Sequence, residues 1–203
     1  YMTLDGTEVD VWNPQTNLTP RRVVANGSSR APTFEANGRN GRGIVKFDGS
    51  EAMTIYDNSL NVTQPLSFVL VMKFPTGSAK TIFDFGNGSG TGRIMMRSTS
   101  TTGQFELKNG ATRNSATVSA LDGSTWGYMV LTLSNDSCKW RINGGNEVTV
   151  AVTDDFGAIS LGGDYQPANF AIQDIMHFII YDKALSDSEI TDIEEWCASE
   201  VGT

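Results

Sequence analysis

The chain of 203 residues contains only two cysteines, Cys138 and Cys197, and a single histidine, His177. A lone histidine with no cysteine nearby is a poor transition-metal site, and no nucleophile can be paired with it. We therefore interpret His177 as a hydrogen-bonded core or interface residue. The two cysteines either form one disulfide or remain buried free thiols, with the second slightly favoured, and they leave the redox compartment open.

Positive charge and long apolar runs are also scarce. Lys and Arg number 15 against 23 Asp and Glu, which gives a formal net charge of −8. Negative charge repels phosphate backbones and anionic lipid headgroups, so the composition argues against nucleic acid and membrane partners. No apolar run reaches the ~20 residues that a membrane-spanning helix needs. The sequence has no signal-peptide pattern and begins with Tyr1 instead of Met. We therefore expect a mature, cleaved or excerpted chain.

Short runs rich in β-branched and aromatic residues fill much of the chain, and each ends at Gly, Asn, Asp or Pro. The thirteen runs are 8–12, 43–49, 52–56, 67–74, 80–86, 92–98, 103–110, 116–120, 128–134, 138–144, 147–152, 158–163 and 175–182. Their number and regular spacing predict an all-β antiparallel sandwich rather than parallel βαβ units. No linker, internal repeat or low-complexity tract divides the chain, so residues 1–203 are predicted to form a single domain.

Turn residues predict how some of these strands connect. Asn143-Gly144 can adopt the positive φ angles of a tight hairpin turn, which makes 128–152 a predicted three-stranded meander. Alternation in 128–134 is not clean, so this strand is expected to be buried on both faces. Residues 13–42 hold several turn formers and are predicted to be an ordered excursion with little regular structure.

One helix is predicted in LSDSEITDIEEWCAS, near the end of the chain. Ser186 is the N-cap and Glu189 completes a capping box, while Gly202 is the expected stop. The apolar residues at helical spacing should dock on the sandwich. They are Ile190, Ile193 and either Trp196 or Cys197.

The order of these segments resembles the concanavalin A-like lectin/glucanase superfamily, in the laminin-G-like branch common in bacterial and phage proteins. The resemblance lies in RAPTFEANGRNGRGIVKFDGSEAMTI, SFVLVMKF, WGYMVLTLSNDSCKWRINGGNEV and IMHFIIYDKALSDSEITDIEEW, taken in that order. It implies a jelly roll of two antiparallel sheets with a C-terminal α-helix, and ligand binding at loops along one edge or on the concave face. One departure is His177, which stands where the family's closing strand often has an acidic residue.

The resemblance raises two kinds of site built from carboxylates, a catalytic pair and a calcium site. Related glucanases use a Glu-x-Asp-x-x-Glu pattern on one strand. Glu8-Val9-Asp10 is followed by Asn13 instead of Glu, so we interpret 8–12 as an exposed edge strand protected by charge. Loop oxygens of Asp154, Asp155, Asp164 and Asn169 leave a bound calcium open as an alternative.

Glycan binding needs aromatic faces beside planar polar groups. The segment GGDYQPAN, before the closing strand, offers this combination. The predicted ligand-binding residues are Tyr165, Asp164, Gln166 and Asn169 in that segment, with Tyr56 and Trp12 as further candidates.

These features favour a non-catalytic recognition module that binds a polysaccharide or host-surface glycan, outside a cell or on a virion surface. The alternative is a structural component of a phage capsid, tail or other extracellular assembly, which a compact, acidic chain also fits. A polysaccharide-cleaving enzyme is the third interpretation. Fold alone does not decide among them.

Overall fold

The computed structural model describes the strands, the helix and their connections, in segments separated by gaps. The described residues are 2–5, 8–12, 23–25, 31–55, 64–75, 80–86, 94–99, 104–109, 112–117, 125–152, 158–163 and 169–202. The first eight strands are β1 (Met2–Asp5), β2 (Glu8–Trp12), β3 (Val23–Ala25), β4 (Thr33–Arg39), β5 (Arg42–Asp48), β6 (Met53–Ile55), β7 (Leu66–Lys73) and β8 (Thr81–Gly86). The rest are β9 (Ile94–Ser98), β10 (Gln104–Asn109), β11 (Thr112–Thr117), β12 (Trp126–Ser134), β13 (Ser137–Ile142), β14 (Val148–Ala151), β15 (Ala158–Leu161), β16 (Ile172–Tyr181) and α1 (Asp187–Val201).

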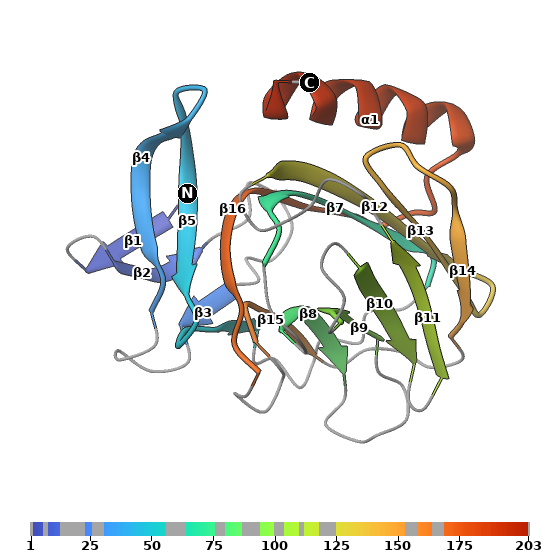
Figure 1. The fold of residues 1–203 in the computed structure, drawn as a ribbon, viewed down its shortest axis with the longest axis horizontal. Coiled ribbons are helices and arrows are strands. Elements are labelled where there is room, and N and C mark those ends of the chain that lie inside the picture. Colours follow the sequence, from blue (N-terminus) through green and yellow to red (C-terminus); the bar gives the residue numbers. More distant parts are fainter. Residues whose placement is uncertain are drawn as a thin grey trace.

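The strands form two facing antiparallel layers (Figure 1). The upper layer runs β5-β16-β7-β12-β13-β14, and the lower layer runs β11-β10-β9-β8-β15-β6. Strands β3, β2 and β4 connect the two layers along one side, and β11 contacts β14 at the other side. The predicted antiparallel sandwich with one C-terminal helix is confirmed.

The space between the layers is filled by alternate side chains from both of them. Phe68 of β7 meets Phe85 of β8 with ring centroids 4.3 Å apart, and Phe83 stacks on Phe85 at 4.5 Å. Trp140 of β13 is almost completely buried in the same cluster. This inter-layer core leaves the opposite face of each layer available for other contacts.

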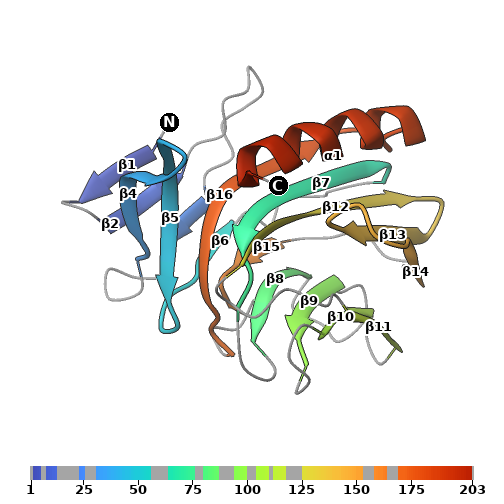
Figure 2. The same ribbon diagram turned by 45° about the horizontal axis from the view of Figure 1, so that its top comes forward.

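Helix α1 lies across the outer face of the upper layer (Figure 2). A second apolar cluster fills this contact and includes Val71, Val130, Ile190, Cys197 and Val201. Strand β12 is therefore buried on both faces, as its irregular alternation predicted. Within the described residues, no helix is both long and apolar enough to cross a membrane.

The predicted turn and helix caps are present. Asn143 has φ 49° and Gly144 has φ 66°, although β14 begins only at Val148, so the loop is longer than a two-residue hairpin. The Ser186 side chain accepts a bond from the Glu189 N–H, and the Ser186 N–H donates to Glu189 Oε2 at 2.9 Å. Gly202 ends the helix at φ 78° in the left-handed conformation.

Two expectations about the first fifty residues are wrong. Residues 13–42 contain regular structure, because β3 lies within them and β4 pairs with β5 through a turn at Asn40 and Gly41. Strand β2 is not an edge strand, because it pairs with β1, β3 and β4. Because turn-forming residues lie within 33–39, the sequence pattern did not predict this strand. Its partner, β5, lies directly after it in the chain.

The tip of the β4–β5 hairpin holds the C-terminal end of α1. Arg39 Nη2 donates to the Val201 carbonyl at 2.5 Å, and Asn40 Nδ2 donates to the Glu200 carbonyl at 2.7 Å. Arg42 forms two bonds to the Glu200 carboxylate, at 2.8 and 3.0 Å. The bonds from Arg39 and Asn40 satisfy helix carbonyls that otherwise lack partners.

His177 belongs to β16 and contacts α1. Its Nε2 is 3.0 Å from Glu200 Oε2, and its ring centroid is 5.0 Å from that of Trp196. The interpretation of His177 as a hydrogen-bonded interface residue is confirmed. Trp196 and Cys197 were the two alternatives for the last docking position of the helix. Cys197 is buried, whereas Trp196 is 37% exposed.

Candidate functional site

The lower layer has a polar outer face, which we define as the polar face. Its described residues are Thr54, Thr81, Asp84, Met95, Arg97, Glu106 and Ser160. The residues next to them in each strand, such as Met53, Phe85, Met96 and Ile159, belong to the inter-layer core. Successive side chains of a strand point to opposite faces, so the polar residues point away from that core.

Strand register lines these residues up in two transverse rows. In the first row, Thr54 is opposite Ser160, Ser160 is opposite Asp84, and Asp84 is opposite Met95. In the second row, Thr81 is opposite Arg97 and Arg97 is opposite Glu106. Five strands, β6, β15, β8, β9 and β10, therefore contribute to one surface.

Contacts within the polar face agree with this register. Thr54 Oγ1 lies 3.4 Å from Ser160 Oγ, and Thr81 Oγ1 donates to Met95 Sδ at 3.6 Å. Arg97 forms an ion pair with Glu106 through its Nε. An arginine fork held by a carboxylate on one side keeps further N–H donors for a partner such as a sugar hydroxyl.

The two rows differ in how accessible they are. Asp84, Ser160 and Thr54 are completely buried, whereas the Arg97 side chain keeps 17% of its surface exposed. A ligand can therefore reach the polar face at its Arg97 end. At that end the partly exposed guanidinium of Arg97 lies beside the buried carboxylate of Glu106 and the buried residue Thr81, and the three come from adjacent strands.

The loop between β15 and β16 has both of its ends anchored at this same end of β8. The Thr81 N–H donates to the Asn169 carbonyl at 2.9 Å, and the Gly162 N–H donates to the Ile82 carbonyl at 3.0 Å. Ala171 in turn donates to the Gly162 carbonyl at 2.8 Å. Gly162 and Asn169, on either side of segment 164–168, therefore lie beside Ile82 and Thr81.

Of the predicted ligand-binding residues, Asn169 is the one whose backbone and side chain both lie within the described part of the chain. Asn169 is exposed with φ 52°, and its carbonyl bonds Thr81 at the edge of the polar face. Tyr165, Asp164, Gln166 and Tyr56 lie outside the described residues. The backbone of Trp12 ends β2, but its side chain lies outside the description as well. These residues remain predictions.

Three of the candidate calcium ligands also lie outside the described residues, namely Asp154, Asp155 and Asp164. Among the residues that the structure does describe, no three His, Cys, Asp or Glu side chains gather as metal ligands. The polar face contributes Asp84 and Glu106 from strands β8 and β10, with Arg97 already paired to the latter.

Sequence reasoning missed Arg97, Glu106 and Asp84, although a signal was present. In each of the runs 80–86, 92–98 and 103–110, a charged residue interrupts an apolar strand. Period-two alternation could have assigned these three residues to an outward face. It could not have shown that Arg97 and Glu106 meet, because that depends on strand register.

Comparison with solved structures finds the same fold in carbohydrate-related domains. The ligand-binding domain of botulinum neurotoxin serotype D, in complex with N-acetylneuraminic acid, has a TM-score of 0.60 and 15% identity, over 94% of this chain and 51% of that chain. Domain 4 of AbnA, a GH43 extracellular arabinanase from Geobacillus stearothermophilus in complex with arabinotriose, has a TM-score of 0.61 and 18% identity, over 80% and 81%. This chain therefore spans about half the length of the neurotoxin chain.

Sequence comparisons give one match. No curated protein sequence matches this chain. The family model described as the concanavalin A-like lectin/glucanases superfamily matches residues 47–191, which is well over half of the chain. The matched region runs from the end of β5 into α1 and so includes the strands of the polar face. The chain therefore belongs to the concanavalin A-like lectin/glucanases superfamily.

Proposed function

We propose that this protein is a non-catalytic glycan-binding module that acts outside the cell. The ligand contacts the Arg97 end of the polar face and the adjoining segment 164–169, where Tyr165 supplies an aromatic face. The observation that carries the proposal is that Arg97, the partly exposed residue of the polar face, lies between Glu106 and Thr81, beside the anchored ends of that loop.

The chemistry of these groups suits sugars. A guanidinium donates to hydroxyl oxygens in a plane, a carboxylate accepts from hydroxyl hydrogens, and a tyrosine ring packs against sugar C–H groups. Support also comes from superfamily membership and from neighbours of the same fold solved with N-acetylneuraminic acid and with arabinotriose. Because the neighbours share less than a fifth of their residues, they support the class of ligand and not its identity.

A glycan array followed by calorimetry tests the proposal. We expect Arg97→Lys to weaken binding of an array-positive glycan about tenfold, because lysine keeps the charge beside Glu106 but loses the planar fork. Tyr165→Ala is expected to weaken it similarly. Lys139→Ala is the matched control, because Lys139 forms an exposed ion pair with Glu147 on the other layer.

Several outcomes would contradict this assignment. Arg97→Lys and Tyr165→Ala proteins that bind every positive glycan as tightly as the parent would place the ligand elsewhere. A chain that binds no glycan but self-associates in light scattering would favour the structural alternative. Release of reducing sugar that is lost when Asp84 or Glu106 is changed to its amide would show that the protein is an enzyme.

A further inference from the structure

A second accessible row crosses the upper layer, just beyond the C-terminal end of α1. Register places Lys46 of β5 opposite Asp174 of β16, and Asp174 opposite Lys73 of β7. Lys73 in turn is opposite Trp126, the first residue of β12. We call these four residues the outer row.

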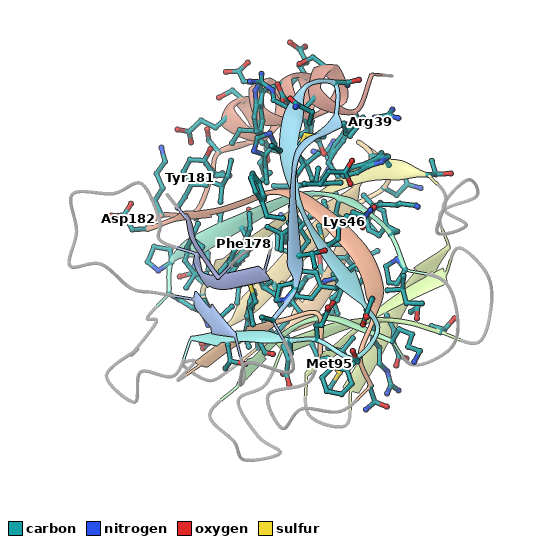
Figure 3. The ribbon with its side chains drawn as sticks, turned by 90° about the vertical axis from the view of Figure 1, so that its left-hand side faces the viewer. Arg39, Lys46, Met95, Phe178, Tyr181 and Asp182 are labelled. Carbon is teal, nitrogen blue, oxygen red and sulfur yellow. The ribbon has the colours of Figure 1, made fainter. Side chains whose placement is uncertain are left out.

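The outer row points away from the inter-layer core. Val45, Ile175 and Met72, each adjacent in sequence to a member of the row, belong to that core. Alternation then directs Lys46, Asp174 and Lys73 to the face on which α1 lies. The polar face is on the opposite side of the molecule, as the positions of Lys46 and of Met95 in Figure 3 illustrate.

The β4–β5 hairpin bounds the outer row. The Arg39 guanidinium lies 6.0 Å from the centroid of the Trp126 ring while it bonds the last turn of α1. Figure 3 shows Arg39 at the helix end of the hairpin and Lys46 further down the same hairpin. Trp126 is only partly buried, although it packs against the apolar cluster under α1.

Charge is distributed unevenly in this row. Lys46 Nζ bonds Glu35 Oε2 at 3.1 Å, but Lys73 forms no ion pair within the described ranges of the chain. Burial raises the pKa of Asp174, and the charges of Lys73 and Lys46 oppose that rise. Three cations, with Arg39, therefore face two carboxylates, in a protein whose net charge is −8.

We infer that the outer row, with Arg39, is a second ligand site that takes a carboxylated pyranose, the sugar unit of acidic polysaccharides and sialylated glycans. The sugar ring packs on Trp126, and its carboxylate pairs with the ammonium of Lys73. Asp174 accepts bonds from the sugar hydroxyls. Charge complementarity selects the ligand, because the outer row with Arg39 and Glu35 has one more cation than carboxylates.

Binding of defined oligosaccharides tests this inference. Trigalacturonate and 3′-sialyllactose are the carboxylated probes, and galactotriose and lactose are their neutral counterparts. At low ionic strength we expect at least one carboxylated probe to bind about tenfold more tightly than its neutral counterpart and to shift the indole N–H resonance of Trp126. Which carboxylated probe binds distinguishes a uronic acid from a sialic acid. Binding should weaken as salt is added.

Lys73→Gln carries the mutational test, because the Lys73 ammonium has no ion pair in the described structure whose loss could unfold the protein. We expect it to weaken binding of the carboxylated probe about tenfold, while Lys139→Gln, an exposed control on β13, leaves binding unchanged. Equal affinity for charged and neutral probes, or equal behaviour of Lys73→Gln and Lys139→Gln, would overturn the inference.

The same experiment separates this site from the glycan site proposed above. Arg97→Lys should leave binding of the carboxylated probe unchanged, because Arg97 lies on the outer face of the other layer. If Arg97→Lys and not Lys73→Gln abolishes that binding, the carboxylated probe occupies the polar face and the second site does not exist.

Discussion

At the scale of single residues, a few polar side chains hold strained backbone in place. Asn143 combines a left-handed φ of 49° with a bond from the Tyr128 N–H to its Oδ1 at 2.8 Å. Its own N–H donates to the Tyr128 carbonyl at 3.0 Å. One residue therefore closes the β13 turn and also fixes it to the start of β12.

Substitutions at Asn143 should separate these two roles. Asn143→Ala loses both the hydrogen bond and the tolerance for positive φ, and we expect it to lower the free energy of unfolding by about 1–3 kcal/mol. Asn143→Gly keeps the backbone conformation and should cost less. Urea denaturation measures the difference, with Asn146→Ala, exposed in the same loop, as the control. Equal losses for Ala and Gly would show that backbone strain is unimportant here.

At the scale of elements, α1 depends on the β4–β5 hairpin as well as on its apolar face. The Glu200 carboxylate is 9% exposed and accepts bonds from His177 and Arg42. The hydrogen bonds from His177 and then from Arg42 lower the pKa of Glu200 below its usual value. A hairpin that is remote in sequence thus stabilises the last turn of the helix.

This contact predicts a pH-dependent contribution to stability. Since the pKa of Glu200 is lowered by folding, its contribution is complete above the unfolded value near 4.5 and is lost as the pH falls through the lower folded value. At pH 7, Glu200→Gln should reduce the free energy of unfolding by about 1–2 kcal/mol, and at pH 3 by clearly less. Urea titrations at both pH values provide the measurement.

Glu147→Gln is the control for that titration, because Glu147 forms only an exposed ion pair with Lys139. It should change stability by less than ~0.5 kcal/mol at either pH. A Glu200→Gln protein whose deficit is the same at pH 3 and pH 7 would show that the carboxylate charge does not stabilise the helix end.

At the scale of the whole molecule, one layer of strands separates two apolar cores. Cys138 of β13 lies in the inter-layer core, whereas Cys197 of α1 lies in the cluster under the helix. Both thiols are free and completely buried. Burial raises the pKa of Cys197 to about 12 and raises the pKa of Cys138 further. The interpretation as two buried free thiols is confirmed.

The native protein should therefore resist thiol reagents. We expect 5,5′-dithiobis(2-nitrobenzoate) to modify neither cysteine in buffer at pH 8 and both cysteines in urea, because the thiolate is the reactive form. Dithiothreitol should leave the Tm unchanged. Loss of a disulfide that closed the loop between Cys138 and Cys197 would instead lower the free energy of unfolding by roughly 4 kcal/mol. A Tm that falls by several degrees on reduction would contradict the free-thiol assignment.

The amino-acid sequence by itself determined most of the strands, the capped helix and the superfamily, because these depend on local patterns. Period-two runs, the turn at Asn143-Gly144 and the capping box at Ser186 each require only near neighbours in the chain. The same reasoning failed for 33–39, where turn-forming residues lie inside a strand.

Only the tertiary structure decided which polar residues meet. Arg97 and Glu106 come together through the register of β9 and β10, and Lys46, Asp174 and Lys73 through strands β5, β16 and β7. Period-two alternation along one strand shows which face of the layer a side chain is on. Which side chain lies next to it on the neighbouring strand depends on how the two strands pair. Both proposed sites depend on such cross-strand neighbours, since the groups of each site come from several strands of one layer.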